Sequence, residues 1–306
     1  MNNLELTDLR IFFHVARLSS FAVTAQELGV SPAYVSKRIA ALEQRFGVSL
    51  FHRTTRRVRI TEQGEIAYAW VRKILENIED MSTEMSNTKV DPSGSLRIST
   101  TLRLGRNHVS PILSMLGKRF PRLDIWLELA STRMDMIEEG IDIDVRVGEV
   151  PEPHLFARRI IKSERILCAA PDYLESRGVP STVQELTQHE CLLFRGRDQA
   201  FGLWRLQGPS GVESIKVTGR VGSNQGDIVR NWALDGHGII MLSDWDVADD
   251  LDNGHLVRVL PNHSQVADVM AVTAARSANT AKIRYGMDFL IDHLRQGPFA
   301  LRGIGF

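Results

Sequence analysis

The sequence predicts an α/β protein with a small helical domain at its N-terminus, one long connecting helix and a larger C-terminal region. Three observations support this prediction. Residues 20–64 show two short helical segments around a tight turn and then a basic hairpin, residues 62–87 show a heptad pattern, and residues 95–306 alternate strand and helix signals. A length of 306 residues fits two or three domains, which we place at 1–61, 62–90 and 91–306.

The N-terminal segment has the turn chemistry of a helix-turn-helix. Its first helix ends at Gly29, which can adopt the left-handed conformation found after helix C-termini. Ser31 then supplies the N-cap of a second helix, and Pro32 occupies the first helical position, where its missing N–H costs nothing. The buried face of that helix is expected to comprise Val35, Ile39 and Leu42. The side expected to meet DNA in the major groove comprises Ser31, Pro32, Ala33, Tyr34, Ser36, Lys37 and Arg38.

Charge is distributed unevenly along the chain. Residues 1–62 contain nine Lys or Arg against five acids, although the whole chain sums to zero, so the remainder is acidic. Seven of those nine cations lie between Lys37 and Arg59, where Glu43 is the opposing acid. A basic domain at one end is typical of a nucleic-acid partner, and contacts with phosphates make binding salt-dependent. The alternative, a solvated helical face, explains neither the caps nor the basic hairpin.

An ordered set of landmark residues over the first sixty-odd positions resembles a known family. The set comprises Leu9, Phe12, Ala16, Phe21, Ala25, Leu28, Ser36, Ile39, Leu42, Glu43, Leu50, Phe51, Arg53 and Thr61 to Gly64. It resembles the winged helix-turn-helix of LysR-type transcriptional regulators. The chain departs from the family at Thr24, usually the first of two alanines, and at Pro32–Ala33, commonly Gln-Pro. The resemblance implies that Ser36 and Lys37 lie in the major groove, and that Arg53, Arg56 and Arg57 lie near phosphates or the minor groove.

A long helix is predicted from Glu62 to about Asn87, a stretch without proline. Its apolar residues recur at spacings of 4, 3, 4, 3 and 4, which form a heptad seam for a partner helix. The seam comprises Ala67, Val71, Ile74, Ile78, Met81 and Met85. The alternative is one amphipathic helix packed on its own domain, but a helix that bridges two domains favours a partner chain. The resemblance implies the family's linker helix, which pairs subunits, and residues 90–95 form a Pro/Gly/Ser hinge after it.

The C-terminal region reads as alternating strands and helices. Strands are expected at 96–100, 123–129, 141–147, 165–170, 214–221, 239–242, 257–260 and 269–273. Helices are expected from Ser110 to before Phe120, over 228–234 and over 280–293. The family resemblance implies a two-lobed effector domain like the type 2 periplasmic solute-binding proteins, with the ligand between the lobes. Lobe one then covers about 95–162 and 267–302, and lobe two about 163–266.

Two polar loops are expected to bind a small anion. The first, residues 99–108, ends at a capped helix beginning at Ser110–Pro111, and the second, residues 222–227, leads into another helix. Arg146 lies in an apolar strand, where an ion pair with Asp142, Asp144 or Glu149 and a ligand contact both remain open. The candidate effector contacts are Ser99, Thr100, Thr101, Arg103, Arg106, Arg146, Ser223 and Asn224. Segments such as GRNHVSPIL and RILCAAPDYL resemble the subgroup that controls tartrate and D-malate utilisation genes, which implies a hydroxy-dicarboxylate effector.

Composition and motifs limit the compartment, the thiol chemistry and the kinds of enzyme or metal site that we expect. The N-terminal residues lack the pattern of a secretory signal, and no apolar run is long enough to cross a membrane, so we expect a cytoplasmic protein. Cys168 and Cys191 suit a reducing compartment, and a buried inert thiol is favoured over a redox switch because Cys168 lies in an apolar run. The scattered histidines form no metal motif, and GxSxG, GxGxxG and P-loop patterns are absent, so we expect no enzyme, cofactor or metal.

The expected partners follow from these features and from the resemblance. They are double-stranded operator DNA, a small anionic effector and further copies of this chain in a homodimer and homotetramer, with RNA polymerase as a further candidate. The remaining alternative is an architectural DNA-binding protein whose C-terminal half oligomerises and senses no ligand.

Overall fold

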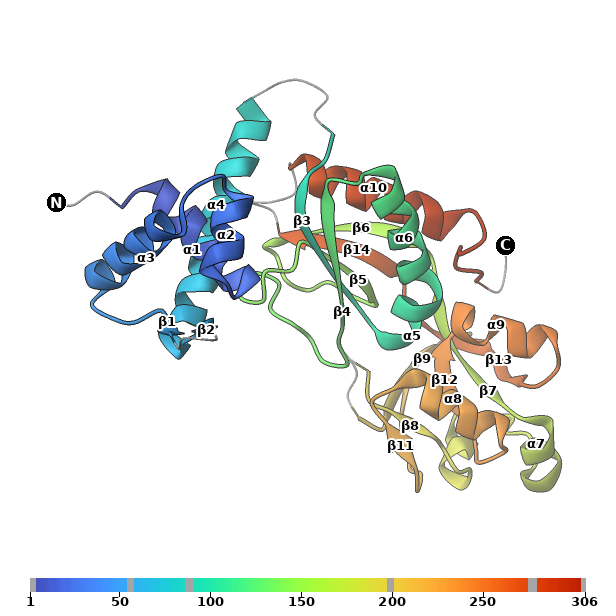
Figure 1. Cartoon of the computed structure of the whole chain (residues 1–306). Coiled ribbons are helices and arrows are strands. Elements are labelled where there is room, and N and C mark those ends of the chain that lie inside the picture. Colours follow the sequence, from blue (N-terminus) through green and yellow to red (C-terminus); the bar gives the residue numbers. More distant parts are fainter. Residues whose placement is uncertain (1–3, 54–57, 86–90, 197–200, 275–279, 304–306) are drawn as a thin grey trace. The chain divides into compact units, whose positions relative to one another are not determined.

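The structure is a computed structural model that describes residues 4–53, 58–85, 91–196, 201–274 and 280–303. The chain divides into two compact units, residues 1–90 and 91–306 (Figure 1). Within the described residues, no helix is both long enough and apolar enough to span a bilayer.

The N-terminal unit is a helix-turn-helix followed by a two-stranded wing. Its elements are α1 (Leu6–Leu18), α2 (Phe21–Glu27), α3 (Pro32–Phe46), the antiparallel strands β1 (Phe51–Arg53) and β2 (Val58–Ile60), and α4 (Glu62–Met85). The predicted turn is confirmed, because Gly29 has a φ of 65° and the Ser31 hydroxyl accepts a hydrogen bond from the Tyr34 backbone N–H at 3.2 Å. The predicted face of α3 is also buried, and Val35, Ile39 and Leu42 pack with Phe12 in one core.

Close contacts fix the wing against the end of α3. The Glu43 carboxylate accepts hydrogen bonds from the backbone N–H groups of Leu50 and Phe51 at 2.8 and 3.2 Å. The Thr61 hydroxyl accepts from the N–H of Gly64 at 2.9 Å, at the start of α4. A Cβ at Gly64 would lie 2.2 Å from the Leu50 carbonyl oxygen, so the chain requires glycine there. These contacts give physical reasons for several of the landmark residues.

Helix α4 uses part of its predicted seam inside its own unit. Val71 is 3% exposed and lies in the core of the N-terminal unit, and Ala67 packs against that core. Val71 is therefore used within its own unit and is not available to a partner helix, whereas Ala67 is partly buried and its contact with a partner stays a prediction. Among the other seam residues, Ile74 and Met81 are exposed, Ile78 is partly buried, and the side chain of Met85 lies outside the described residues.

The C-terminal unit contains two five-stranded sheets (Figure 1). Lobe one is the sheet β4 (Leu123–Leu129), β3 (Gly94–Thr100), β5 (Ile143–Val147), β14 (Val269–Ala274) and β6 (Leu155–Ile161), with α6 (Ser110–Arg119) and α10 (Ala281–Arg295). Lobe two is the sheet β10 (Gly211–Lys216), β9 (Leu203–Gly208), β13 (Val257–Val266), β7 (Glu164–Ala169) and β12 (Ile240–Ser243), with α7 (Pro171–Arg177), α8 (Gly226–Leu234) and α9 (Asp244–Asp252). A 3-10 helix (Gln184–Gln188) and the parallel pair β8 (Leu193–Phe194) and β11 (Gly222–Ser223) complete lobe two. The chain passes between the lobes from β6 to β7 and from β13 to β14.

Each lobe has its own apolar core. In lobe one, α6 and α10 lie side by side over the sheet, and residues such as Leu116 and Leu290 are fully buried between these layers. In lobe two, apolar residues of the central strand β7 alternate between two clusters, with Leu167 in one and Ile166 and Cys168 in the other. Both faces of β7 are therefore covered, which explains why its residues from Ile166 to Ala169 are all apolar.

Several elements differ from the sequence-based expectation. The helix expected to begin at Ser110 begins at Leu102, with a short α5 (Leu102–Leu104) and a π-helical turn (Gly105–Val109) that continue into α6. Ser110 is not an N-cap, because its N–H bonds to the carbonyl of Gly105, five residues back. This wider turn directly precedes Pro111, which has no N–H for the regular helical ladder. The strand expected over 214–221 ends at Lys216, and the sequence prediction missed β6, β9, α7 and α9.

Candidate functional site

The exposed side of α3 carries most of the residues predicted to read DNA. Four of them form its first turn and its cap, and Lys37 follows one turn later. The exposed members are Ser31, Pro32, Ala33, Tyr34 and Lys37, and Ser36 is partly buried. Helix α3 presents its N-terminal residues in the manner of a recognition helix, which meets base edges in the major groove.

Arg38 has a structural role in this domain. Its guanidinium forms ion pairs with Asp8 and Glu5 of the α1 region, and Asp8 is itself buried. The hydrogen bond to Asp8 is the largest influence that raises the pKa of Arg38, with Glu5 adding to it. These two acids join α3 to α1 through the Arg38 guanidinium, and the contact of Arg38 with DNA stays a prediction.

The wing arginines stay predictions. Arg53 ends strand β1, but its side chain lies outside the described residues, as do Arg56 and Arg57 entirely. The described part of the wing, an antiparallel pairing of Phe51 with Ile60 and of Arg53 with Val58, places both strands beside the end of α3.

A cavity of about 70 Å³ lies between the lobes of the C-terminal unit. Lobe one contributes Thr101 and Arg103 from the end of β3 and the start of α5, together with Ser131 after β4. Lobe two contributes Arg165 from β7 and the segment 224–226 at the start of α8. Further lining residues are Leu102, Ala130, Val147, Phe194, Gly196, Leu242, Ser243, Trp245 and Asp246. Two guanidinium groups, hydroxyls, an amide and the first turns of α8 and α9 surround this space, a combination that suits a small anion.

Two ion pairs connect the lobes beside this cavity. Arg103 pairs with the carboxylate of Asp246, and its guanidinium also donates to the Asp246 backbone carbonyl at 2.9 Å. Arg106, which is largely exposed, lies 3.7 Å from the carboxylate of Asp227. Burial raises the pKa of Asp246 to about 6, although Arg103 and Arg230 act in the opposite direction. Both predicted arginines of the first loop therefore already have acidic partners on lobe two.

Trp245 belongs to lobe two but packs into lobe one. Its indole is 9% exposed and belongs to the same apolar cluster as Leu104 and Leu301. The ring of His108 meets it edge-on at 5.7 Å, and His108 is held in turn by a 3.0 Å contact with the carbonyl of Phe299. Burial is the main cause that lowers the pKa of His108. The first turn of α9 thus docks onto lobe one through Trp245 and Asp246 together.

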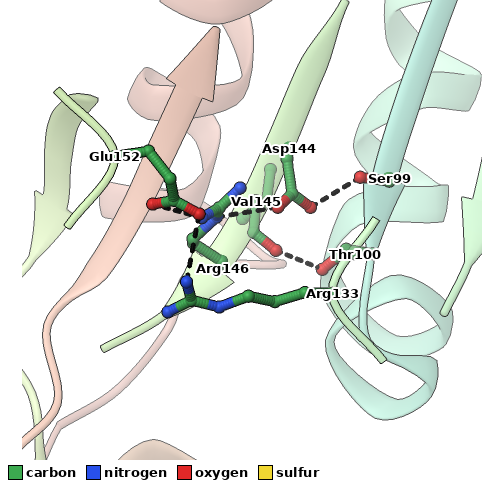
Figure 2. Close-up of polar contacts among 7 residues, drawn as sticks. All are labelled: Ser99, Thr100, Arg133, Asp144, Val145, Arg146 and Glu152. Carbon is green, nitrogen blue, oxygen red and sulfur yellow. Dashed lines mark hydrogen bonds and ion pairs between the residues drawn. The ribbon is translucent and has the colours of Figure 1, made fainter. Parts of the chain in front are cut away.

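A network of polar side chains connects strands of the lobe-one sheet (Figure 2). The Arg146 guanidinium donates to the Asp144 carboxylate at 2.8 Å and to Glu152 at 3.2 Å. The Ser99 hydroxyl donates to the other Asp144 oxygen at 2.6 Å, and the Thr100 hydroxyl donates to the Val145 carbonyl at 2.8 Å. Ser99, Thr100 and Arg146 are all buried.

This network bears on the two interpretations of Arg146. The ion pair is present, with Asp144 as predicted and with Glu152 where Glu149 had been the third candidate. Ser99, Thr100 and Arg146 do not line the cavity, and their polar atoms bond to Asp144, Val145 and Glu152, so their contact with an effector stays a prediction.

Two models of known protein families match this chain. A model of the bacterial regulatory helix-turn-helix of the lysR family matches residues 6–65, and a model of the LysR substrate binding domain matches residues 89–295. The chain belongs to the LysR family of transcriptional regulators. Members of this family bind DNA and small-molecule effectors and are not enzymes, so the large C-terminal unit of this LysR regulator is an effector-binding domain.

Two curated relatives and one solved structure illustrate the match. The HTH-type transcriptional regulator DmlR of Escherichia coli K12 is 46% identical over 291 residues, which cover 95% of each chain. The HTH-type transcriptional activator TtdR of the same strain is 36% identical over 283 residues, 92% of this chain and 91% of that protein. The structure of CrgA, a LysR-type regulator from Neisseria meningitidis, covers 96% of this chain and all of that one with a TM-score of 0.60 at 28% identity.

In this LysR regulator, some of the predicted effector residues line the cavity and others do not. Thr101, Arg103 and Asn224 line it, whereas Arg106 and Ser223 do not belong to its lining. The Ser223 hydroxyl instead accepts from the Gln225 backbone N–H at 3.1 Å. The missed residues include Arg165, Trp245 and Asp246. The sequence does distinguish Arg165, because it is a cation directly before the apolar residues Ile166–Ala169. Arg146 is likewise a cation between apolar residues of β5.

The two cysteines are buried in lobe two. Burial raises the pKa of the Cys168 thiol strongly and that of Cys191 to about 12. Thiols in this state remain protonated and react poorly, in line with the preference for inert thiols over a redox switch.

Proposed function

We propose that this LysR regulator binds a small hydroxy-dicarboxylate, such as tartrate or malate, in the cavity between its lobes. The observation that carries the proposal is the convergence of Arg103, Arg165, Thr101 and Asn224 on one space. Guanidinium groups bind carboxylates through paired hydrogen bonds, and hydroxyl and amide groups can recognise the ligand's own hydroxyls.

The size of the cavity supports a ligand of few carbon atoms. Its volume of about 70 Å³ corresponds to roughly five waters, since one water occupies roughly 10–15 Å³ on this measure. A four-carbon diacid is of this size, whereas a large aromatic acid would require the lobes to move apart. The relatives DmlR and TtdR support the same ligand class, because they match the subgroup that the sequence already resembles.

We infer that DNA is bound by two copies of the N-terminal unit in the cytoplasm. Helix α3 supplies Lys37 and its first turn, and the wing arginines supply phosphate contacts. The linker helix α4 pairs the copies through an exposed apolar stripe that differs from the predicted seam, since Ile66 and Trp70 are exposed where Val71 is buried. The stripe comprises Ile66, Trp70, Ile74 and Met81. Dimers then assemble into a tetramer, and the ligand acts by favouring one arrangement of the copies over another, with RNA polymerase as a further partner.

Thermal denaturation against D-malate, L-malate, tartrate and succinate tests the ligand. A ligand at 100 times its Kd should add about 2.7 kcal/mol to the free energy of unfolding, which corresponds to about 5–10 °C for a domain of this size. The variant Arg165→Gln should abolish the shift, and Thr101→Val should weaken it without removing a charge. Arg220→Gln is the matched control, because Arg220 is exposed on the same lobe and lies outside the cavity lining.

A flat panel from a well-folded protein would refute the dicarboxylate assignment. Fluorescence anisotropy with operator DNA, with and without ligand, then separates the two functional classes. Binding to DNA that no small anion alters would favour the architectural alternative, in which the C-terminal unit oligomerises only.

A further inference from the structure

We propose that Asp246 occupies the position of a ligand carboxylate in the cavity, so that an anionic ligand binds by displacing Asp246 from Arg103. The proposal rests on the proposed function, because it describes how an anion would enter that same cavity. It makes Asp246 a residue that sets the affinity for the ligand, although Asp246 carries the same charge as the ligand.

The placement of Asp246 is the first argument. Its carboxylate is buried in the wall of the cavity and forms an ion pair with Arg103 of the opposite lobe. Its second oxygen is directed to the start of α8, because a Cβ at Gly226 would lie 3.7 Å from Oδ2. One carboxylate is therefore paired with a guanidinium and lies close to the positive end of a helix of nine residues, which are the groups that a bound anion would use.

The charges around Asp246 provide the second argument. Arg103 of lobe one and Arg230 and Asp227 of α8 are the charged groups that act on Asp246, while Arg106 and Asp250 pair with Asp227 and Arg230. These groups are already paired, with Arg230 bound to Asp250 at 2.5 Å and Arg106 lying 3.7 Å from Asp227. Of these three pairs, Arg103 with Asp246 is the one in which both members line the cavity. An anion that binds the Nε side of Arg103 must displace the Asp246 carboxylate from it, so the two carboxylates compete for that side of the guanidinium.

Protonation of Asp246 changes this competition. Burial raises the pKa of Asp246 to about 6, so its negative charge is partly lost as the pH falls to 6, and neutral Asp246 holds Arg103 less strongly. If the ligand binds only when Asp246 is protonated, its apparent affinity should fall about 50-fold from pH 6 to pH 8. His108 contacts the neighbouring Trp245 and burial lowers its pKa, so a variant of Asp246 is needed to assign any dependence on pH to Asp246.

Isothermal titration of the full chain with D-malate and with tartrate at pH 6, 7 and 8 tests the proposal. The wild-type protein should lose affinity with rising pH and should take up close to one proton per ligand at pH 8, measured in two buffers of different ionisation enthalpy. Asp246→Asn should bind at least tenfold more tightly than wild type at pH 8, with little dependence on pH. Asp249→Asn is the matched control, because Asp249 is exposed on the same helix, and it should follow wild type.

The possible failures are distinguishable. Wild-type binding that is independent of pH, or an Asp246→Asn variant that binds no more tightly than wild type, would overturn displacement and leave the ligand site in place. If neither anion binds wild type or Asp246→Asn at any pH, the proposed ligand class fails and the displacement of Asp246 fails with it. Should Asp246→Asn not fold, the pH series and the proton uptake of the wild-type protein decide the matter alone.

Discussion

Removing the Arg146 guanidinium should destabilise the C-terminal unit far more than removing an exposed arginine from strand β6 of the same sheet. The side chains of Arg146 and Asp144 are 5% and 6% exposed, and they are joined at 2.8 Å. In Arg146→Met the apolar stem remains, but the Asp144 carboxylate keeps its charge in the sheet without its cation. Breaking a buried pair in this way costs about 3–5 kcal/mol. That is a large part of the roughly 5–15 kcal/mol that stabilises a typical domain.

The control is Arg158→Met on strand β6. Arg158 pairs with Asp288 at 2.5 Å, but both side chains are about half exposed, at 48% and 49%. Exposed pairs contribute about 0–1 kcal/mol, so this variant should be nearly as stable as wild type. Urea denaturation followed by circular dichroism gives the free energy of unfolding of each variant, and a constant m-value keeps the comparison valid.

A second substitution tests whether the uncompensated charge of Asp144 causes the loss of stability in Arg146→Met. Asp144→Asn keeps an acceptor for the Ser99 hydroxyl while removing the charge. The double variant Arg146→Met/Asp144→Asn should therefore be no less stable than Arg146→Met alone, since the uncompensated charge is gone. The reasoning is refuted if Arg146→Met costs less than about 1 kcal/mol. It is equally refuted if that variant loses ligand affinity while its stability is unchanged, which would favour the ligand-contact interpretation of Arg146.

Three further predictions concern other parts of the chain. Gly64→Ala should lower the stability of the N-terminal unit by about 3 kcal/mol in thermal denaturation, because its Cβ would lie 2.2 Å from the Leu50 carbonyl oxygen, and an unchanged melting temperature would contradict this packing. Lys37→Ala should leave the melting temperature unchanged but weaken binding to operator DNA by about 1–3 kcal/mol and binding to unrelated DNA much less, and an equal loss on both DNAs would exclude a base contact. The folded-state pKa of Asp246, about 6, lies above that of a free aspartate, so its burial should destabilise the protein as the pH rises from 4 to 6. The stability of wild type relative to Asp246→Asn should fall by about 3 kcal/mol from pH 4 to pH 7, and a constant difference in urea denaturation would refute the raised pKa.

Local chemistry explains which elements could be predicted from the sequence. The turn between α2 and α3 depends on Gly29, Ser31 and Pro32, all neighbours in the chain, and the structure confirms it. The Ser-Pro pair recurs at Ser110–Pro111, where the same signal misleads, because the helix has already begun at Leu102 and a π-helical turn accommodates the proline. The conformation of the preceding backbone decides whether the serine of a Ser-Pro pair caps a helix. That conformation depends on strands that are distant in the sequence.

Side-chain partners that come from distant segments could not be predicted in the same way. Arg38 lies on the outer side of α3 in the sequence pattern, but Asp8 and Glu5 reach it across the helix packing. Val71 fits a heptad seam as well as a core position, since a spacing of three or four residues serves both. The cavity illustrates the same limit, because Arg165 faces Arg103 only once the two lobes are folded against each other.

The burial of Trp245 disfavours separation of the two lobes. Its indole belongs to lobe two but is buried among the side chains of lobe one, so full separation of the lobes exposes roughly 200 Å² of aromatic surface to water. At about 25 cal/mol per Å² this exposure costs about 5 kcal/mol, so only a few molecules in ten thousand would be fully open at any moment. We therefore expect small anions to enter through local movement of the loops around residues 131 and 224, and to leave slowly once bound.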